Sequence, residues 1–454
     1  MTEIIRKKLS DSAGARWTAL LIVAFTMMMG YFITDVMSPL EVILETSKEQ
    51  GGLGWSSSDY GFFAGSYGLI NVFMLMLFFG GIILDKMGIR FTGVMASGLM
   101  VIGVIIKYFG VTTDFGDSKF TLDFVNFSLP MSAAIASLGF AIFGVGCEIC
   151  GITISKIITK WFTGHELALA MGVQVGLARL GTTAAMAGSL PLAKAFGNHV
   201  SAPILLGLVL LIAGFLAFIV YTVMDKKLDA STGEVTGNVS DEDEGFHFAD
   251  LKFIFNPGFW CITLLCLMFY SGVFPFLKFA TKLMVDNYNV PQDLAGSLPG
   301  AIPLGTIILT PLFGTIYDRI GKGATLMLIG SIMLTFVHFI FMIHILPVGW
   351  FAIIMMIILG IAFSLVPSAM WPSVPKIIPM KLLGSAYAII FYIQNIGLSL
   401  VPMAIGKINK ADPSFTGMET FFIGCGIAAI IIAFVLMLID RKKHYGLQQA
   451  NVKK

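Results

Sequence analysis

Charged side chains are scarce in this sequence. Aspartate, glutamate, lysine and arginine together make up 12% of the 454 residues, whereas apolar residues make up 57%. Soluble domains carry about 25% charged residues, so this scarcity excludes a soluble globular protein. The apolar residues recur in runs of eighteen or more, which is the length of a membrane-spanning helix. Backbone groups find no water inside a bilayer, so these runs must form helices, and they are too uniformly apolar for the alternating strands of a barrel.

Cysteine and the signatures of enzyme sites are also scarce or absent. The five cysteines lie within apolar runs, where we interpret them as buried apolar side chains without a disulfide framework. The sequence has no zinc-ligand cluster, P-loop, nucleophile elbow or dinucleotide fingerprint. We therefore expect no metal, no cofactor and no enzymatic activity. Nucleic-acid binding is not expected either, because the basic residues mark membrane topology.

The apolar runs predict an all-α membrane protein with twelve transmembrane helices. An even number of spans places both termini on one side of the membrane. Most of the 29 lysines and arginines fall in the predicted loops on that side, so the positive-inside rule places the termini in the cytoplasm. The predicted spans are 17–39, 58–83, 92–110, 131–157, 168–192, 201–224, 258–283, 293–316, 323–345, 349–373, 384–408 and 418–439.

A polar, acidic segment divides these spans into two groups of six. Residues 225–252 contain the stretch DASTGEVTGNVSDEDEG, which is typical of a flexible cytoplasmic linker. We therefore predict an N-terminal six-helix bundle at residues 1–224 and a C-terminal six-helix bundle at residues 253–454. We expect a monomer in the lipid bilayer, and the need for an accessory subunit stays open.

A repeated motif supports the division into two halves. It follows the second span of each half, and the second copy lies 233 residues after the first. Glycines permit close approach of helices, the aspartate can cap a helix or pair with a cation, and the basic residue anchors the cytoplasmic surface. The first copy contains Gly81, Asp85, Gly88 and Arg90, and the second contains Gly314, Asp318, Arg319 and Gly321. We predict that both copies act in cytoplasmic gating.

Two isolated charges near the centre of the sequence point to a solute site. Glu148 lies 12 residues before Lys160, and Arg179 lies 13 residues after Glu166. At the helical rise both lie roughly 18–20 Å from the same membrane surface, near the middle of the bilayer. An isolated charge costs at least about 2.5–3.5 kcal/mol there and therefore usually faces a cavity and a partner. The alternative is a structural ion pair that joins two helices.

The doubled motif resembles the signature loop of the major facilitator superfamily, and the resemblance covers essentially the whole chain. Several motifs are similar to the lysosomal dipeptide uniporter branch of that superfamily. They are Gly144-Val-Gly-Cys-Glu148, Trp161-Phe162-Thr-Gly164, Gly172-Val-Gln174, Ala178-Arg179-x-Gly181-Thr182, Tyr31-Phe32-x-x-Asp35, Phe274-Pro275-Phe276, Trp371-Pro372 and Gln394-Asn395-x-Gly397. The resemblance implies two pseudo-symmetric bundles that transport by alternating access. It also implies that Glu148 and Arg179 hold the ammonium and the carboxylate of a dipeptide.

The residues themselves favour a zwitterionic substrate and suggest further contacts. Arg179 offers a planar fork of donors for a carboxylate, and Glu148 offers an anion for an ammonium group. Asp35 is a candidate for the ammonium group or for a proton, and also for a wetted helix end, while Lys278 either meets an anionic group or reaches to the interface. In the second half we predict substrate contacts from neutral side chains, each of which could equally join helices. These are Asn395, Gln394, Tyr392, Trp371 and Ser368.

We therefore expect a dipeptide uniporter. The alternatives are a proton-coupled peptide symporter and an organic-anion exchanger that uses Arg179, with Glu148 as its counter-charge. A receptor without transport is disfavoured, because the sequence has no sizeable soluble domain beyond the linker. Residues 1–16 contain no acidic dileucine sorting signal, which favours the plasma membrane, with the lysosomal membrane as the location in a eukaryote.

Overall fold

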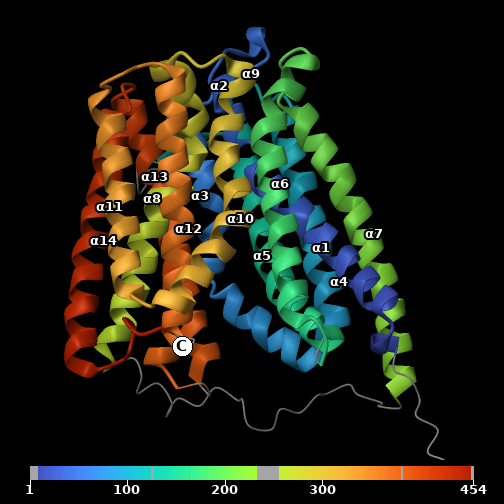
Figure 1. The fold of residues 1–454 in the computed structure, drawn as a ribbon. Coiled ribbons are helices and arrows are strands. Elements are labelled where there is room, and N and C mark those ends of the chain that lie inside the picture. Colours follow the sequence, from blue (N-terminus) through green and yellow to red (C-terminus); the bar gives the residue numbers. More distant parts are fainter. Residues whose placement is uncertain (1–8, 124–126, 163, 233–254, 380–381, 451–454) are drawn as a thin grey trace, which may run out of the picture. The chain divides into compact units, whose positions relative to one another are not determined.

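The structure, a computed structural model, is almost entirely helical (Figure 1). It describes residues 9–123, 127–162, 164–232, 255–379 and 382–450. The long helices are α1 (Ala13–Asp35), α3 (Ser57–Phe73), α4 (Met76–Thr112), α5 (Met131–Phe162), α6 (Leu167–Ala195), α7 (Ser201–Thr232), α8 (Pro257–Tyr288), α10 (Ser297–Ile320), α11 (Gly323–Ile343), α12 (Gly349–Ile377), α13 (Leu383–Ala411) and α14 (Thr416–Lys443). Shorter elements connect them: η1 (Leu9–Asp11), η2 (Ser38–Leu40), α2 (Glu41–Leu44), η3 (Lys48–Gln50) and α9 (Gln292–Ala295).

Every predicted span overlaps one or two of the long helices. Among the described residues, 10 helices are long and apolar enough to cross a membrane. This finding confirms an all-α, multi-pass membrane protein. The helices α3 and α6, which correspond to the second and fifth predicted spans, do not belong to these ten. The number twelve is therefore not confirmed and stays a prediction.

The predicted second span, 58–83, is not a single helix. The chain leaves α3 after Phe73 and enters α4 at Met76, and between them Leu75 has a left-handed φ of 53°. α4 then continues through the predicted third span, with a break at Gly88, where φ is 76° and ψ is 171°. Hydropathy alone could not reveal either break, because each depends on the backbone angles of one residue rather than on the polarity of a run.

The connections differ from the sequence prediction at two places. After α4 the chain forms an antiparallel hairpin of β1 (Lys119–Leu122) and β2 (Phe127–Pro130), in which Lys119 lies opposite Pro130. α7 continues to Thr232, so the first eight residues of the predicted linker are helical. The rest of that linker lies outside the described residues.

The helices form two compact units, which we call unit 1 and unit 2. Unit 1 contains residues Met1–Met37, Leu69–Ala185 and Ser201–Asp241, and unit 2 contains Ser38–Gly68, Met186–Val200 and Glu242–Lys454. The units differ from the predicted halves because two N-terminal segments, 38–68 and 186–200, belong with the C-terminal helices. The boundaries at 1–224 and 253–454 stay a prediction.

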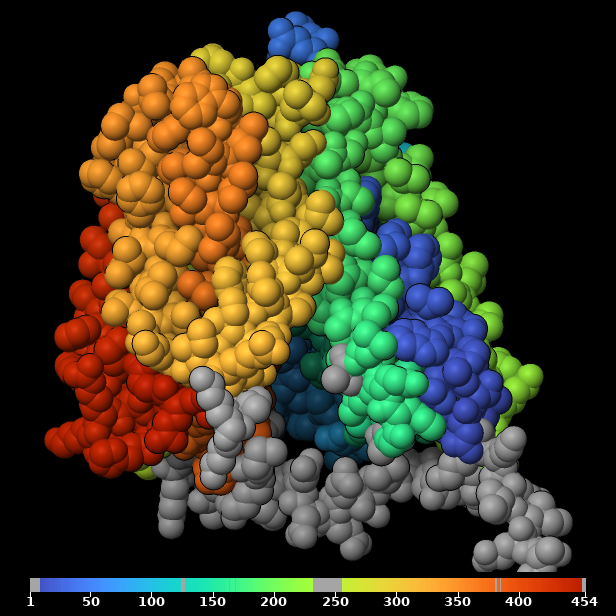
Figure 2. All heavy atoms as spheres, in the orientation of Figure 1, coloured from blue at the N-terminus to red at the C-terminus, as the bar shows by residue number. Residues whose placement is uncertain are grey.

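Each unit is held together by lengthwise packing of its helices. In unit 1, α4 packs along α5, and α7 packs against both α1 and α4. In unit 2, α11 packs on α12 and α14, α12 packs on α10, and α8 packs on α13 and α14 (Figure 1). The face of unit 2 in Figure 2 is covered largely by α10, α11 and α12. Large apolar side chains are exposed along α11 at helical spacing, as expected for a lipid-facing surface: Ile329, Ile332, Phe336, Phe339 and Ile343.

Candidate functional site

Three helices of unit 1 meet closely at the predicted charges. Gly181, two residues after Arg179 on α6, lies so near α1 that a side-chain carbon there would collide with the Met28 carbonyl. Gly30 on α1 in turn lies against the side chain of Cys147, the residue before Glu148 on α5. Small residues allow helix backbones to approach in this way. α1 therefore lies against the helices that carry the two predicted charges.

Tyr31 on α1 marks the place where these groups come together. Its phenol interacts electrostatically with Arg179, Glu148 and Asp35. Tyr31, Glu148 and Arg179 are half-buried, and Asp35 is buried. The structure therefore groups Asp35, Glu148 and Arg179 in unit 1, at one place on three helices. Such a set of two carboxylates, one guanidinium and one phenol can bind a solute that carries both an ammonium and a carboxylate group.

Tyr31 is a site residue for which the sequence analysis proposed no role. It appeared there only inside the motif that ends at Asp35. Its position was readable in principle, because residues four apart lie on one face of a helix and Asp35 was already a candidate.

Asp35 is the last residue of α1, and proline explains why the helix ends there. Pro39 follows four residues later and has no N–H to donate to the carbonyl of Asp35. The chain then continues as η2 and α2 in unit 2. Asp35 therefore stands at a break between helical segments, where its backbone environment is less regular than in a continuous span.

The polar candidates of the C-terminal half lie in unit 2. Ser368 donates to the Leu365 carbonyl of its own helix at 2.9 Å, and Gln394 Oε1 accepts from the thiol of Cys266 at 3.4 Å. Asn395 Nδ2 donates to the Phe391 carbonyl at 2.9 Å. Its Oδ1 is buried without a hydrogen-bond partner among the described residues. Of these three side chains, Asn395 is therefore the one with a buried acceptor that a substrate donor could bind.

An aromatic cluster in unit 2 contains Trp371. Its indole N–H donates to the Tyr270 hydroxyl at 3.2 Å, and its ring stacks on Phe391 with centroids 5.0 Å apart. The hydroxyl of Tyr387 donates to the Trp371 carbonyl at 3.3 Å. The cluster fixes the orientation of Trp371. Tyr392, the other aromatic candidate, is half-buried.

Lys278 lies on α8 in unit 2 and is half-buried. Its backbone carbonyl accepts a hydrogen bond from the Tyr60 hydroxyl on α3 at 3.0 Å. The next lysine of the helix, Lys282, pairs with Glu45. This part of α8 therefore contacts segments that lie far earlier in the sequence.

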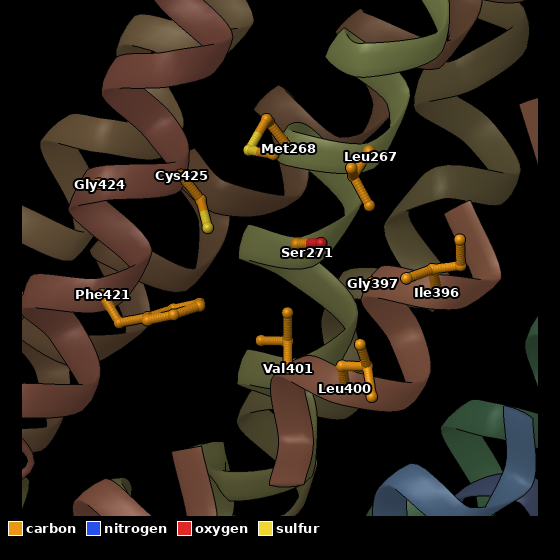
Figure 3. A pocket seen from close by; sticks show the side chains of 10 residues that line it. All are labelled: Leu267, Met268, Ser271, Ile396, Gly397, Leu400, Val401, Phe421, Gly424 and Cys425. Carbon is orange, nitrogen blue, oxygen red and sulfur yellow. The ribbon is translucent and has the colours of Figure 1, made fainter. Parts of the chain in front are cut away.

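A cavity of about 480 Å³ lies between α8, α13 and α14 in unit 2 (Figure 3). Its lining is apolar apart from Ser271, and it contains no charged side chain. The walls are Leu267, Met268, Ser271, Ile396, Gly397, Leu400, Val401, Phe421, Gly424 and Cys425. None of the predicted substrate-binding residues lines it. An apolar cavity of this kind offers nothing for the charges of a zwitterion.

The first copy of the repeated motif takes part in ion pairs at the end of unit 1. Asp85 pairs with Lys156 of α5 at 2.7 Å, and Arg90 Nε pairs with Asp225 of α7 at 2.7 Å. Asp225 is buried and also accepts from Lys160 at 2.9 Å. Gly88 is the helix break described above, a backbone conformation that glycine adopts readily. The motif thus ties α4 to α5 and α7.

Sequence reasoning missed Asp225, which it assigned to the start of the linker. The hydroxyl of Tyr221 and the indole N–H of Trp161 also donate to this carboxylate, at 3.1 Å and 3.2 Å. Asp225 follows Tyr221 by four residues, so a helical continuation of the sixth predicted span, 201–224, would have placed both on one face.

The second copy of the motif has a similar backbone but different partners. Gly321 ends α10 with a φ of 73°, in the position that Gly88 occupies in the first copy. The backbone N–H groups of Lys322 and Gly323 donate to the carbonyls of Gln448 and Leu447 at 3.1 Å and 2.8 Å. Arg319 is exposed. The C-terminal residues therefore occupy the turn of this copy.

The long apolar helices, the repeated turn and the charges grouped in unit 1 define a multi-pass membrane protein of the helical transporter class. The sequence profile of the Major Facilitator Superfamily matches residues 20–402, and the chain belongs to this family.

Relatives in the family are similar over most of the chain. A protein named lysosomal dipeptide transporter MFSD1 from Danio rerio is 26% identical over 82% of this chain and 77% of its own length. The Homo sapiens protein of the same name is 24% identical over 81% of this chain and 76% of its own. The resemblance to the dipeptide transporter branch is confirmed by these matches.

Solved structures share the fold. A bacterial homologue of the human lysosomal transporter Spinster, in an inward-facing and occupied conformation, has a TM-score of 0.71 and 15% identity, and the match covers 95% of this chain and 98% of that one. A POT family transporter in complex with 5-aminolevulinic acid has a TM-score of 0.68 and 15% identity, over 93% and 96% of the two chains. At this identity the similarity establishes the fold.

Proposed function

We propose that this protein transports dipeptides across a membrane by uniport and alternating access. Arg179 binds the carboxylate of the dipeptide, and Glu148 binds its ammonium group. The observation that carries the proposal is the grouping of Glu148, Arg179 and Asp35 around Tyr31. The name of the relatives, lysosomal dipeptide transporter, supports the same substrate.

The energetics of buried charge explain why a zwitterion suits this site. Removing one partner of a buried ion pair leaves an uncompensated charge, which costs about 3–5 kcal/mol. A ligand with both charges can compensate Glu148 and Arg179 at the same time. A ligand with only one charge compensates either Glu148 or Arg179 and leaves the charge of the other without compensation from the ligand.

The C-terminal half supplies neutral contacts in this proposal. When the two halves are aligned on the segments that end at Gly181 and Gly397, Asn395 corresponds to Arg179, and a serine corresponds to Glu148. Hydrogen bonds from Asn395, Gln394, Tyr392 and Ser368 then read the peptide backbone, and Trp371 packs on a side chain. The unpartnered Oδ1 of Asn395 supports its part in this set. Lys278 is the remaining candidate, for an anionic side chain of the substrate.

Two other transport modes remain open alternatives. Asp35 or Glu148 could carry a proton in a peptide symporter, because both are carboxylates within the membrane span. An organic-anion exchanger would need only Arg179. We favour uniport in a membrane with both termini in the cytoplasm, as the distribution of lysine and arginine predicts.

Thermal stabilisation of the purified protein tests the substrate class. A ligand that binds the native state at ten times its Kd stabilises it by roughly 1.4 kcal/mol. We expect a rise in Tm with free dipeptides and none with single-ended analogues, monocarboxylates or sugars. Stabilisation by monocarboxylates and not by dipeptides would support the exchanger instead.

Neutralising Glu148 tests the assignment of the two ends. Glu148→Gln removes the charge but keeps the size of the side chain. A hydrogen bond to a charged group contributes about 1.5–3 kcal/mol, so binding of free dipeptides should weaken roughly 10- to 100-fold. N-acetylated dipeptides have no ammonium group and should lose much less. An equal loss for both ligands would remove the proposed role of Glu148.

A further inference from the structure

A lysine lies fully buried among the helices of unit 1. Lys107, on α4, has no exposed surface. Its ammonium donates to the carbonyl of Ile33 on α1 at 3.1 Å and lies 4.6 Å from the centroid of the Phe140 ring on α5. A buried lysine within a membrane span is costly and marks a functional position by default.

The carbonyl that Lys107 binds belongs to the end of α1. The last four carbonyls of a helix have no partner inside it, and the C-terminal end of a helix carries a partial negative charge. In α1 these are residues 32–35, and the last of them is Asp35 itself. A carboxylate at a helix C-terminus is unfavourable, so a cation close by stabilises both the free carbonyl and this acidic end.

Lys107 is itself held in place by tight packing of α4 on α5. A side-chain carbon at Gly139 on α5 would collide with the backbone nitrogen of Lys107. The Phe140 ring that contacts the ammonium stacks on Phe143 with centroids 5.9 Å apart. α5 also carries Glu148, two to three turns further along. Lys107 therefore connects the end of α1 to the helix pair that includes the Glu148 helix.

We propose that Lys107 is a positioning residue for the substrate site. Its ammonium fixes the end of α1 and so places Tyr31 and Asp35, which flank Ile33, opposite Glu148 and Arg179. This inference rests on the proposed function for the identity of the ligand. The placement of α1 itself can be measured without any ligand.

Lys107→Met tests the proposal, because it keeps the length of the side chain and removes the charge and the donors. A displacement of about 1 Å at a site can cost 10²-fold, so we expect the KM for a free dipeptide in proteoliposomes to rise about 10- to 100-fold. The preference for the free over the N-acetylated dipeptide should fall. Lys107→Arg keeps the charge and should retain most of the wild-type affinity. A purely structural role would lower the amount of folded protein and leave the KM unchanged.

Two further variants keep the test decisive. Lys119→Met makes the same change at an exposed lysine of β1, and it should leave the KM unchanged. Phe140→Leu provides the test if Lys107→Met does not fold. It removes the ring but keeps the ammonium and its hydrogen bond, so it should raise the KM about twofold to fivefold. An unchanged KM in folded Lys107→Met, or in Phe140→Leu where the first variant is not obtained, overturns the proposal. An equal change in Lys119→Met also overturns it.

A labelling experiment separates this inference from the proposed function. The substitution Tyr31→Cys introduces a thiol on α1, and its rate of reaction with a methanethiosulfonate is measured with and without the additional substitution Lys107→Met. The same two chains without the added cysteine give the background rate. We expect the rate at position 31 to change several-fold when Lys107 is replaced. If no dipeptide binds the wild-type protein but the rate changes, the proposed function fails and the positioning role stands. An unchanged rate overturns the positioning role.

Discussion

His338 and Glu419 form a buried pair between α11 and α14 of unit 2. Nδ1 of the histidine lies 2.7 Å from Glu419 Oε2, and Nε2 lies 2.9 Å from the Gly272 carbonyl of α8. A carbonyl only accepts hydrogen bonds, so Nε2 carries a hydrogen. The histidine thus joins α11 to α14 through Nδ1 and to α8 through Nε2. Pro275 lies inside α8 and has no N–H to donate to the carbonyl of Ser271, the residue next to Gly272. The histidine therefore supports α8 at the place where the proline weakens the helix.

Removing one member of this pair should be more harmful than removing both. Glu419→Ala leaves Nδ1 of the fully buried histidine without its partner, while Nε2 keeps the Gly272 carbonyl, and we expect a loss of about 1–3 kcal/mol in the free energy of unfolding. The double variant His338→Phe/Glu419→Leu removes both polar groups and should lose less. The Tm in detergent measures both changes, with Glu49→Ala on the exposed η3 as the control. An equal loss in the single and double variants would contradict a coupled pair.

The connection between α5 and α6 contains a pair that depends on pH. A hydrogen bond from its own backbone and one from Arg16 at 3.1 Å hold the pKa of Glu166 below its usual value of 4.5. A carboxyl group whose pKa is lowered by folding stabilises the protein when the pH is above the pKa of the unfolded state. This stabilisation is lost as the pH falls through the folded-state pKa. Glu166→Gln should therefore lower the Tm slightly at neutral pH. The difference from the wild type should vanish at a pH below the folded-state pKa. A difference that persists in acid would assign the effect to packing.

At the scale of elements, the C-terminal residues 444–450 form a segment that binds the second motif copy. Besides its bonds to Lys322 and Gly323, this segment accepts two hydrogen bonds from Lys376, both 3.2 Å long, at the carbonyls of Gly446 and Gln449. The Leu447 side chain is fully buried. The segment thus joins the end of α12 to the turn between α10 and α11.

Truncating Leu447 should destabilise unit 2. The change of a buried leucine to alanine typically costs about 2–5 kcal/mol, so Leu447→Ala should lower the Tm clearly. Lys442→Ala, at an exposed position near the end of α14, is the matched control and should have little effect. If both variants melt like the wild type, the segment does not contribute to the stability of the unit.

The positions of the helices could be predicted, but several of their ends could not. Long apolar runs determine where a chain crosses a membrane, and each predicted span overlaps one or two of the long helices. The break at Leu75 could not be predicted, because no glycine or proline marks it. The break at Gly88 differs, since Gly321 occupies the corresponding place in the second copy and both have a positive φ. A positive φ at a glycine that recurs in both copies of a motif can therefore be predicted from the sequence. A positive φ at an isolated residue such as Leu75 cannot.

The same contrast applies to the candidate site. Glu148 and Arg179 stand out because a charge in the middle of an apolar run has no ordinary explanation. Lys107 does not stand out, because a lysine near the end of a predicted span usually reaches to the interface. Its burial depends on how α1, α4 and α5 pack together. The roles of Glu148 and Arg179 in binding stay predictions.

At the scale of the whole molecule, unit 2 joins segments from both predicted halves of the sequence. The hydroxyl of Ser399 on α13 donates to the Gly65 carbonyl on α3 at 2.9 Å. Lys194 pairs with Asp293 at 2.8 Å. Lys282 on α8 pairs with Glu45, which also accepts from the Ser57 hydroxyl. Asp293 belongs to α9 and Glu45 follows α2, and both of these short helices lie at the opposite end of unit 2 from the C-terminus (Figure 1).

If transport occurs by alternating access, these contacts must open in every cycle, because rocking of the two halves separates segments that belong to different halves. Replacing Glu45 and Lys282 by cysteine and joining them with a short bis-methanethiosulfonate reagent would keep the contact closed. We expect the double variant to transport before treatment, to lose most of its flux when cross-linked and to recover it on reduction. The single variants Glu45→Cys and Lys282→Cys should be unaffected by the reagent, since the described native cysteines are largely buried. Undiminished flux through the cross-linked protein would mean that this contact stays closed throughout transport, and the access pathway would then have to open elsewhere.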